Sequence, residues 1–382
     1  MSKRLGVIIN PLAGIGGRVG LKGSDGIEIQ REALARGAVP EAQSRAITTL
    51  AELGSIKDTL DIITCSGEMG ETAVQSAGLV PASLVPVNPG TTTAEDTRRA
   101  AKTMQQMSVD LLLFAGGDGT ARDICGAVGT EQPCLGIPAG VKIHSAAFAT
   151  HPRHAGELAV LYLLRTRTSG VFQQEQATVL REVEVIDLDE EAYRQGVVAT
   201  RLYGYLKIPF RRHLVQNQKV PSPVAEIVQA RAIAEDVIEN MQADTLYILG
   251  PGTTTRPIAE RLGLSKTLVG VDVVTREGVI LLDACEAQLL ELIKDRPARI
   301  VVTPIGGQGF IFGRGNQPLS PRVLEIVGKN NLIVVSTTEK IHALGGRPLL
   351  VDTGSAAIDA MLSGYITVIT GYHERIVYQV SS

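Results

Sequence analysis

Short apolar runs alternate with amphipathic stretches along the first 150 residues of the chain. The apolar runs have the length and composition of strands and lie at Leu5–Ile9, Leu60–Thr64, Ser83–Val87, Asp110–Ala115 and Cys134–Ile137. The stretches between them have helical spacing and lie at Glu41–Leu53, Glu71–Ala77, Thr93–Met107 and Ala121–Val128. This alternation predicts a parallel sheet covered by helices. Because such sheets bind ligands at the carboxyl ends of their strands, the residues after each strand are the candidates for chemistry.

The pattern changes after a helical stretch at Arg153–Thr166. Ala177–Leu188 and Val197–Ile208 have alternating polarity with no helix between them, which predicts an antiparallel β element. Strands and helices then alternate again from Val224. The predicted helices are 224–241, 258–262 and 287–295, and the predicted strands are 245–249, 268–274, 299–303, 332–336, 365–370 and 375–380.

We therefore expect an α/β protein of two domains, with the boundary near residue 150. Residues 1–150 would form the parallel-sheet domain. Residues 151–382 would form a larger mixed C-terminal domain, with a β-rich portion at 170–210 and 364–382 and an α/β portion at 224–360.

The composition is that of a water-soluble enzyme. Of the 382 residues, 44% are hydrophobic and 20% charged, and no apolar run approaches the length of about 18 residues that a membrane span needs. The net charge is −3, without a basic block, which argues against nucleic acid as a partner. The first nine residues hold too few apolar positions for a secretory signal, so we expect a cytoplasmic protein without a membrane partner.

Cysteine and histidine give no sign of a structural metal. Cys65, Cys125, Cys134 and Cys285 stand far apart without a Cys-x-x-Cys pair, which favours reduced core thiols over disulfides or zinc. His151 and His154 are the one close histidine pair, no cysteine lies near them, and we do not expect them to hold a metal.

A glycine-rich turn follows the predicted strand Asp110–Ala115. It reads Gly116-Gly117-Asp118-Gly119-Thr120 and opens a predicted helix, whose amino terminus favours phosphate. Asp118 is the carboxylate in this turn, and it could accept a proton from an attacking hydroxyl or help hold magnesium. The alternative is an ordinary turn with Asp118 as the helix cap, and these five residues favour neither interpretation.

A second glycine loop follows the first strand. It contains Asn10, Pro11, Gly14, Gly16 and Gly17, and its glycines could fold around a phosphate. It is not a Walker A loop, because no Gly-Lys-Ser/Thr follows. A flexible turn would also explain these residues, but the position of the loop at another strand end of the same sheet favours a binding role.

Several polar residues near these loops have both a functional and a structural interpretation. Lys142 could meet phosphate oxygens or could be a solvated lysine at a helix start. Asp123 could approach magnesium or the acceptor, or complement a helix dipole. Thr92 and Asp96 could face the same crevice, although Thr92 and Glu95 also have the spacing of a capping box.

The second half of the chain adds two further glycine loops. Gly252, Thr253 and Thr254 follow a predicted strand and could bind a phosphate, whereas an N-cap threonine followed by Pro257 is the structural alternative. Gly307 and Gln308 lie in a loop before Phe310-Ile311-Phe312. We expect these five residues to contribute to a ligand site, as acceptor-site candidates.

The Asn10-Pro11-x-x-Gly14 loop and the Gly116–Thr120 turn together resemble the ATP-dependent NAD kinase superfamily. That superfamily shares its catalytic core with diacylglycerol and sphingosine kinases and, more distantly, with phosphofructokinase. Four further stretches resemble the branch called ATP-NAD kinase family proteins, which includes the acetoin-catabolism X protein. They are residues 91–97, 136–142, 249–255 and 304–310, so the resemblance spans nearly the whole chain.

This resemblance implies an N-terminal kinase domain of NAD kinase type, with ATP and magnesium as the donor and NAD as the acceptor. Asp118 would act as general base on the adenosine ribose 2′-hydroxyl, and Gly116, Gly117 and Gly119 would make room for the ATP phosphates. Such kinases often form homo-oligomers.

One departure leaves the acceptor open. NAD kinases carry an Asn-Glu pair that grips NAD, and no Asn-Glu dipeptide occurs in this chain. A kinase acting on another small hydroxylated metabolite, such as one linked to acetoin breakdown, and a non-catalytic sensor of a nucleotide or sugar phosphate are therefore the alternatives.

Overall fold

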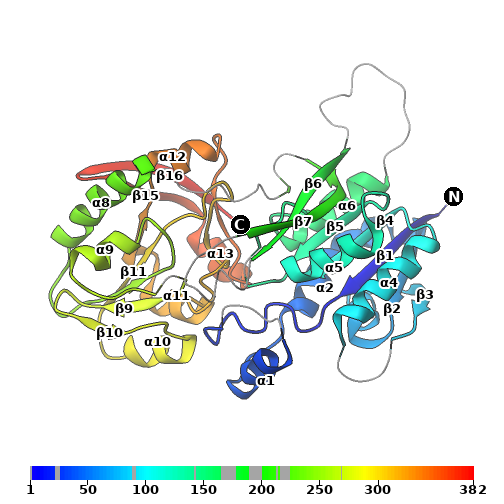
Figure 1. Ribbon diagram of the computed structural model, residues 1–382, viewed down its shortest axis with the longest axis horizontal. Coiled ribbons are helices and arrows are strands. Elements are labelled where there is room, and N and C mark those ends of the chain that lie inside the picture. Colours follow the sequence, from blue (N-terminus) through cyan, green and yellow to red (C-terminus); the bar gives the residue numbers. More distant parts are fainter. Residues whose placement is uncertain are drawn as a thin grey trace. The chain divides into compact units, whose positions relative to one another are not determined.

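The computed structural model divides the chain into two compact units, which Figure 1 colours along the sequence. It describes residues 2–21, 26–87, 92–141, 143–164, 178–188, 200–211, 214–215, 224–267 and 269–382. The first unit comprises Met1–Ile15, Ser24–Gly26 and Val39–Gln216, and the second comprises Gly16–Gly23, Ile27–Ala38 and Asn217–Ser382. The longest continuous part of the first unit thus ends at Gln216, and two short segments before residue 39 belong to the second unit.

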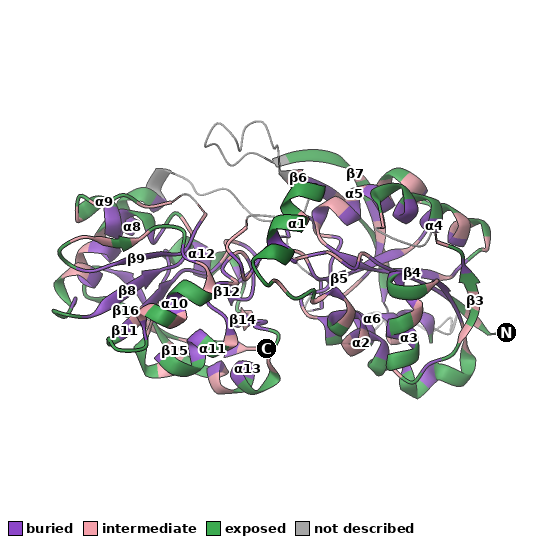
Figure 2. Cartoon of the chain, turned by 90° about the horizontal axis from the view of Figure 1, so that it is seen from below, coloured by how far each residue is buried: buried purple, intermediate pink, exposed green. Residues whose placement is uncertain are grey.

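The first unit is built on a five-stranded parallel sheet of order β3-β2-β1-β4-β5. Its strands are β1 (Lys3–Ile9), β2 (Leu60–Cys65), β3 (Pro81–Val85), β4 (Leu111–Gly116) and β5 (Cys134–Pro138). The helices α4 (Ala94–Gln106) and α5 (Asp118–Val128) cover one face, and α2 (Ala42–Ala51), α3 (Glu71–Ser76) and α6 (Pro152–Leu163) cover the other (Figure 2). Short 3₁₀ turns at Glu52–Thr59 and Gly67–Met69 complete the connections. The predicted parallel sheet with covering helices is confirmed.

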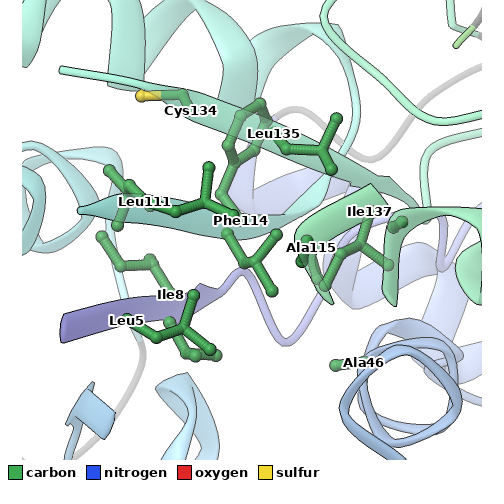
Figure 3. Close-up of a cluster of buried hydrophobic side chains, with 14 of the residues drawn as sticks. Leu5, Ile8, Ala46, Leu111, Phe114, Ala115, Cys134, Leu135 and Ile137 are labelled. Carbon is green, nitrogen blue, oxygen red and sulfur yellow. The ribbon is translucent and has the colours of Figure 1, made fainter. Parts of the chain in front are cut away.

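Burial on both faces explains the continuous apolar runs of the central strands. All six residues of β4 are buried, as parallel strands between two helical layers require. Leu111, Phe114 and Leu135 lie in one cluster with residues of β1 (Figure 3). The ring of Phe114 meets that of Phe148 edge to face, with 5.4 Å between the ring centroids. This packing holds the carboxyl end of β4 in place.

The hairpin of β6 (Val179–Leu188) and β7 (Thr200–Phe210) is antiparallel, as the alternating polarity predicted. It belongs to the first unit, because it packs on α5 and β5 and Lys207 pairs with Pro133 just before β5. This packing explains why the units divide after the hairpin instead of before it.

The second unit is built on a nine-stranded sheet of order β10-β9-β8-β11-β13-β15-β16-β14-β12. Its central neighbours β8, β11, β13 and β15 run parallel. The strands are β8 (Leu246–Leu249), β9 (Asp272–Val274), β10 (Val279–Leu281), β11 (Ala298–Val302), β12 (Phe310–Phe312), β13 (Leu332–Val335), β14 (Leu349–Val351), β15 (Gly364–Gly371) and β16 (Glu374–Ser381). The expected β-rich end at 364–382 is therefore not a separate portion, since β15 pairs with β13 in the same sheet as the α/β portion.

Alternate side chains of the second sheet pack into two separate cores. Leu246 and Ile248 of β8 face the core under α10, α11 and α13, while Tyr247 and Leu249 face the core under α8 and α9. The helices of this unit are α1 (Ile27–Ala35), α8 (Val224–Glu239), α9 (Arg256–Arg261), α10 (Glu286–Leu292), α11 (Pro321–Val327), α12 (Thr338–Ala343) and α13 (Ala356–Leu362), with a 3₁₀ turn at Lys329–Asn331.

Candidate functional site

The start of the loop after β1 and the glycine-rich turn after β4 meet in the first unit, where the strand order of the sheet reverses. The chain runs outward from β1 through β2 to β3 and then returns to β4 on the other side of β1. Open α/β sheets bind ligands at such a switch point, outside the carboxyl ends of the two strands. Asn10 follows β1, and its side-chain amide donates to the Thr120 hydroxyl at 3.1 Å in the first turn after β4. The structure thus brings these two predicted residues together.

The side chain of Asn10 also shapes its own loop. Its Oδ1 accepts from the Leu12 amide at 3.2 Å, and its backbone amide donates to the Ala115 carbonyl at 3.0 Å. The backbone bond to Ala115 extends the pairing of β1 with β4 by one residue. The side-chain bond from Leu12 then turns the chain away from the sheet at Pro11, as an Asx turn does. The Asn-Pro pair therefore has a structural role in ending the strand.

Glycine is required here because the loops pack against one another. Gly14 has a φ of 76°, and a Cβ there would lie 2.1 Å from the Ala139 carbonyl oxygen. A Cβ on Gly116 would lie 2.3 Å from the Thr120 hydroxyl oxygen, and one on Gly117 would lie 3.1 Å from the Gly140 Cα. Close approach of three loops explains these glycines without any ligand. Gly119 lies in the first turn of α5, and Gly16 and Gly17 belong to the second unit.

Asp118 is buried, and its carboxylate is held by a segment that follows β5. The side chain is 5% exposed, and Oδ2 accepts from the His144 backbone amide at 2.7 Å while Oδ1 accepts from the Ser145 amide at 2.9 Å. The His144 ring places Nδ1 3.1 Å from the same Oδ2. An ionised carboxylate only accepts, so this contact requires the proton on Nδ1.

The interpretation of Asp118 as a helix cap is wrong. The N-cap of α5 is Gly117, and Asp118 is the first residue of the helix. The carboxylate accepts from the amides of His144 and Ser145, which lie 26 and 27 positions further along the chain. It does not accept from the amides of its own first turn. A local turn therefore does not explain the aspartate in the glycine-rich sequence.

His144 and Ser145 were missed in the sequence. Ser145 is fully buried, and its hydroxyl donates to the Ile186 carbonyl at 2.7 Å and accepts from the Ile186 amide at 3.0 Å. These bonds tie the segment that holds Asp118 to β6. A lone histidine and serine in an irregular stretch carry no periodic signal, and their place just after residues 136–142 was the one available clue.

The acidic candidates beside this turn are engaged by arginines. Asp123 Oδ1 accepts from Arg98 at 2.8 Å, and Asp96 Oδ1 accepts from Arg99 at 2.6 Å. A hydrogen bond from the Thr93 hydroxyl, helped by Arg99, holds the pKa of Asp96 below its usual value. Both carboxylates lie largely buried.

The capping box expected at Thr92 and Glu95 lies one residue later in the structure. The N-cap of α4 is Thr93, and its partner is Asp96. Thr92 precedes the cap and is partly exposed, while Glu95 pairs with Arg98 at 3.1 Å. The shift places Asp96 on the buried side of the helix. Lys142 lies outside the described residues.

The candidates of the second unit lie at the carboxyl ends of two neighbouring strands. Thr253 and Thr254 follow β8, in a loop that Thr255 closes by donating its hydroxyl to the carbonyls of Gly250 at 2.8 Å and Gly252 at 3.1 Å. Thr255 is the N-cap residue of α9, but its side chain makes no capping bond. The predicted N-cap threonine is thus correct in position only.

The loop after β11 contains the other two candidates. Gln308 is 2% exposed, and the Gly307 carbonyl accepts from the Arg347 guanidinium at 3.0 Å. Lys340 on α12 approaches the β8 loop, and it was missed in the sequence. Its Nζ lies 2.9 Å from the Thr254 hydroxyl oxygen and 3.5 Å from that of Thr253.

Two family models match the chain. The ATP-NAD kinase N-terminal domain matches residues 6–164, and the ATP-NAD kinase C-terminal domain matches residues 239–380, so together they cover most of the sequence. The chain belongs to the ATP-NAD kinase family. The N-terminal match contains the Asn10 loop, the Asp118 turn and His144. The C-terminal match contains the β8 and β11 loops and Lys340.

Solved structures resemble this ATP-NAD kinase family protein only weakly. A protein of Bacillus anthracis str. Sterne that is assigned to the diacylglycerol kinases is 14% identical, with a TM-score of 0.22 over 53% of this chain, and this chain spans 63% of that protein. A UDP-N-acetylglucosamine 2-epimerase is 9% identical, with a TM-score of 0.24 over 90% of this chain and 85% of the other. We draw no conclusion from either likeness. No curated protein matches the chain.

Two further features of this family member concern membranes and metals. None of the helices in the described part of the chain has the length and apolar character to cross a bilayer. Among the same residues, no group of three or more His, Cys, Asp and Glu side chains is placed to hold a metal ion. Magnesium that arrives with a nucleotide does not need such a group, because phosphate oxygens and water complete its coordination around one or two carboxylates.

Proposed function

We propose that this ATP-NAD kinase family protein transfers the γ-phosphoryl group of ATP to a hydroxyl group, with NAD as the first acceptor to test. The observation that carries the proposal is the Asp118 carboxylate. It lies at the switch point of a parallel sheet, beside a helix amino terminus, with both oxygens fixed by backbone amides. The reaction would convert NAD and ATP to NADP and ADP.

Asp118 is the proposed base. Its Oδ1 accepts one hydrogen bond among the described contacts, so acceptor capacity remains for a substrate hydroxyl. The proton of that hydroxyl would move to Asp118 while the hydroxyl oxygen forms a bond to the γ-phosphorus of ATP. The bond from that phosphorus to the bridging oxygen would break, and ADP would leave. Phosphoryl transfer depends mainly on positioning, and the backbone amides of His144 and Ser145 position the Asp118 carboxylate.

The phosphates of ATP are proposed to lie against the amino end of α5. Gly119 and Thr120 lie in its first turn, where the backbone amides have no partner within the helix. Asn10 reaches this turn through Thr120. Magnesium would enter as part of the donor substrate and neutralise charge on its phosphates, and Asp118 is the carboxylate within this turn that could approach it.

A second candidate acceptor follows from one observation about the sequence. The chain lacks the Asn-Glu pair that grips NAD in the kinases it resembles. Asp96 and Asp123 already accept from arginines, so they favour a supporting role over direct contact with an acceptor. A different small hydroxylated metabolite is therefore the alternative acceptor.

A panel of acceptors tests the proposal. Purified protein is incubated with ATP, magnesium and one hydroxylated compound at a time, and ADP release is measured above the rate without acceptor. Release with NAD, matched mole for mole by NADP, supports an NAD kinase. Release with another alcohol alone supports the second candidate. ATP binding without turnover for any acceptor would contradict kinase chemistry and favour a nucleotide sensor.

A further inference from the structure

Helices α8 and α9 lie side by side on one face of the second sheet (Figure 1). α8 leads into the start of β8, so its amino end lies toward the carboxyl edge of the parallel strands. Gln229 anchors this end of the helix there, since its Nε2 donates to the Thr370 carbonyl at 2.7 Å, near the carboxyl end of β15. The amino end of α8 thus lies at the edge where parallel sheets bind ligands.

Glu226 lies in the first turn of α8, on the side that faces the sheet. It precedes Ala230 by four residues and Ile233 by seven, and both of these side chains are buried. Glu226 itself is 7% exposed, and its Oε2 is buried without a hydrogen-bond partner in the described part of the chain. The helix dipole favours a negative charge at this position but supplies no donor to that oxygen. Because acidic side chains are almost never buried without a partner, this carboxylate calls for one.

Thr303 lies at the same edge and on the same face of the sheet. It directly follows β11 and stands two residues after Val301, whose side chain packs in the core under α8 and α9. Gly252, in the loop that leads into α9, lies against it, since a Cβ there would be 2.4 Å from the Thr303 methyl carbon. Thr303 is 8% exposed, and its hydroxyl oxygen is also buried without a hydrogen-bond partner among the described residues. Buried hydroxyls are normally bonded, so this group too lacks an expected partner.

Gln229 and β13 connect these two groups. Gln229 lies one turn after Glu226, and its Oε1 accepts from the amide and the hydroxyl of Thr338, both at 3.2 Å, just after β13. β13 pairs with β11 in the sheet. Glu226 and Thr303 therefore lie over neighbouring strands, at one edge and on one face. Two buried groups without partners at the ligand-binding edge indicate a ligand that supplies the partners.

We infer that this edge of the second unit binds a small molecule with two neighbouring hydroxyl groups, such as a sugar, through Glu226 and Thr303. An ionised carboxylate only accepts, so its partner must donate, and a vicinal diol can donate to both carboxylate oxygens. A ligand hydroxyl also has lone pairs that can accept from the Thr303 hydroxyl, which an ammonium group does not have. The chemistry thus favours a diol over an amine. The site is independent of the reaction proposed for Asp118.

Calorimetric titration of the full-length protein tests this site. The probes are methyl ribofuranoside, which carries a vicinal diol, its 2-deoxy counterpart, which lacks one, and ethylamine, which is a cation without hydroxyls. Glu226→Gln removes the charge and keeps the shape, and Thr303→Val removes the hydroxyl and keeps the shape. Glu239→Gln is the matched control, because Glu239 is an exposed acid of the same helix.

We expect one equivalent of methyl ribofuranoside to bind to the wild type, and its 2-deoxy counterpart to bind at least about tenfold more weakly. Glu226→Gln should weaken binding of the diol by at least about tenfold and Thr303→Val by about threefold to tenfold, whereas Glu239→Gln should bind as the wild type does. Ligand-free Glu226→Gln should also melt at a higher temperature than the wild type, because it removes a carboxylate from a buried position where Oε2 has no donor among the described residues. A carboxylate with a purely structural role would give the opposite shift.

Several results would overturn the inference. They are the absence of diol binding to the wild type at millimolar concentrations, unchanged affinity in both Glu226→Gln and Thr303→Val, and a lower melting temperature of ligand-free Glu226→Gln. Equal binding of the 2-deoxy counterpart, or binding of ethylamine in place of the diol, would also overturn it. If Thr303→Val fails to fold by circular dichroism, Glu226→Gln alone decides. Asp118→Asn should bind the diol as the wild type does, so failure of the site and failure of the kinase proposal are separate outcomes.

Discussion

Asp118 Oδ2 accepts two hydrogen bonds from one residue, His144, through its backbone amide at 2.7 Å and its ring Nδ1 at 3.1 Å. Both side chains are buried. The amide and the ring together occupy Oδ2 and hold the carboxylate in place, which leaves Oδ1, with its one bond from the Ser145 amide, as the oxygen that can accept from a substrate hydroxyl. His144 is therefore a positioning residue for the proposed base, and it does not itself need to touch a substrate.

Replacing His144 should lower turnover without weakening ATP binding. His144→Leu removes the ring donor but keeps the backbone amide, so we expect kcat to fall between about tenfold and 100-fold through misplacement of the carboxylate. The KM for ATP should stay within about threefold. His144→Asn is the matched variant, because its side-chain amide can donate from near the Nδ1 position. Equal loss in both variants would contradict the positioning role.

Glycine at position 116 should be essential for stability, whereas glycine at 126 should not. In Gly116→Ala the new Cβ would lie 2.3 Å from the Thr120 hydroxyl oxygen, and Thr120 is a stiff β-branched residue. We expect a loss of about 1–3 kcal/mol in the free energy of unfolding. Gly126 lies on the exposed side of α5 with nothing within 4 Å of a Cβ. Gly126→Ala should therefore stabilise by up to about 1 kcal/mol.

Urea unfolding of both glycine variants measures this difference. A gain in stability for Gly116→Ala would show that β4 and α5 are spaced more widely than described. A loss for Gly126→Ala similar to that of Gly116→Ala would show that the close approach at residue 116 is not the cause.

The Asp96 capping box should make part of the protein's stability pH-dependent. The hydrogen bond from Thr93 and the Arg99 ion pair hold the pKa of Asp96 below its usual value, so its carboxylate binds protons less readily when folded. Its stabilising effect is fully present above the unfolded value of about 3.9 and is lost as the pH falls through the lower folded value. The stability gap between wild type and Asp96→Asn should therefore be constant near neutral pH and shrink below about pH 4.

Urea unfolding at several pH values measures that gap. Glu95→Gln is the control, since Glu95 lies in the same turn and pairs with Arg98 on the exposed surface. Its effect should be small at every pH. A stability difference between wild type and Asp96→Asn that widens as the pH falls would contradict a lowered pKa of Asp96 as its cause.

Cys65 and Cys134 should resist alkylation in the folded protein. Burial raises the pKa of the Cys65 thiol to about 12 and also raises that of Cys134. The reactive thiolate is then scarce at pH 8, and both sulfurs are covered. Treatment with iodoacetamide followed by peptide mass spectrometry should label the partly exposed Cys285 first. Labelling of Cys65 or Cys134 at the same rate, before denaturant is added, would show that the first sheet opens readily.

Regular, periodic elements were predictable from the sequence, and short or weakly amphipathic ones were not. The strands of the first sheet are continuous apolar runs because helices cover both faces. Helix α1 was missed because Ala33 is its one buried residue, while Ile27, Ile29 and Leu34 are exposed. Strands β10, β12 and β14 have three residues each, too few for a period of two to be recognised.

The candidate site was predictable in its glycines and Asp118 but not in the residues that hold them. Asn10, Thr120 and Asp118 stand at strand ends, where a parallel sheet concentrates polar groups. His144 and Lys340 reach their partners through tertiary contacts 26 and 86 positions apart in the chain. Neither residue lies in a motif, so no local pattern could connect histidine to aspartate or lysine to threonine.

Turnover by Asp118→Asn tests whether Asp118 acts as the base in phosphoryl transfer from ATP. NADP formation is measured with ATP, magnesium and NAD, or the corresponding product if the panel identifies another acceptor. Asp110→Asn is the matched control, because Asp110 lies at the opposite end of β4 and accepts from Lys3 and the Arg4 amide.

We predict that Asp118→Asn binds ATP with near-normal affinity by calorimetry but loses about 10²- to 10⁴-fold in kcat. Asp110→Asn should turn over within about threefold of the wild type. A kcat for Asp118→Asn close to that of the wild type would contradict the account.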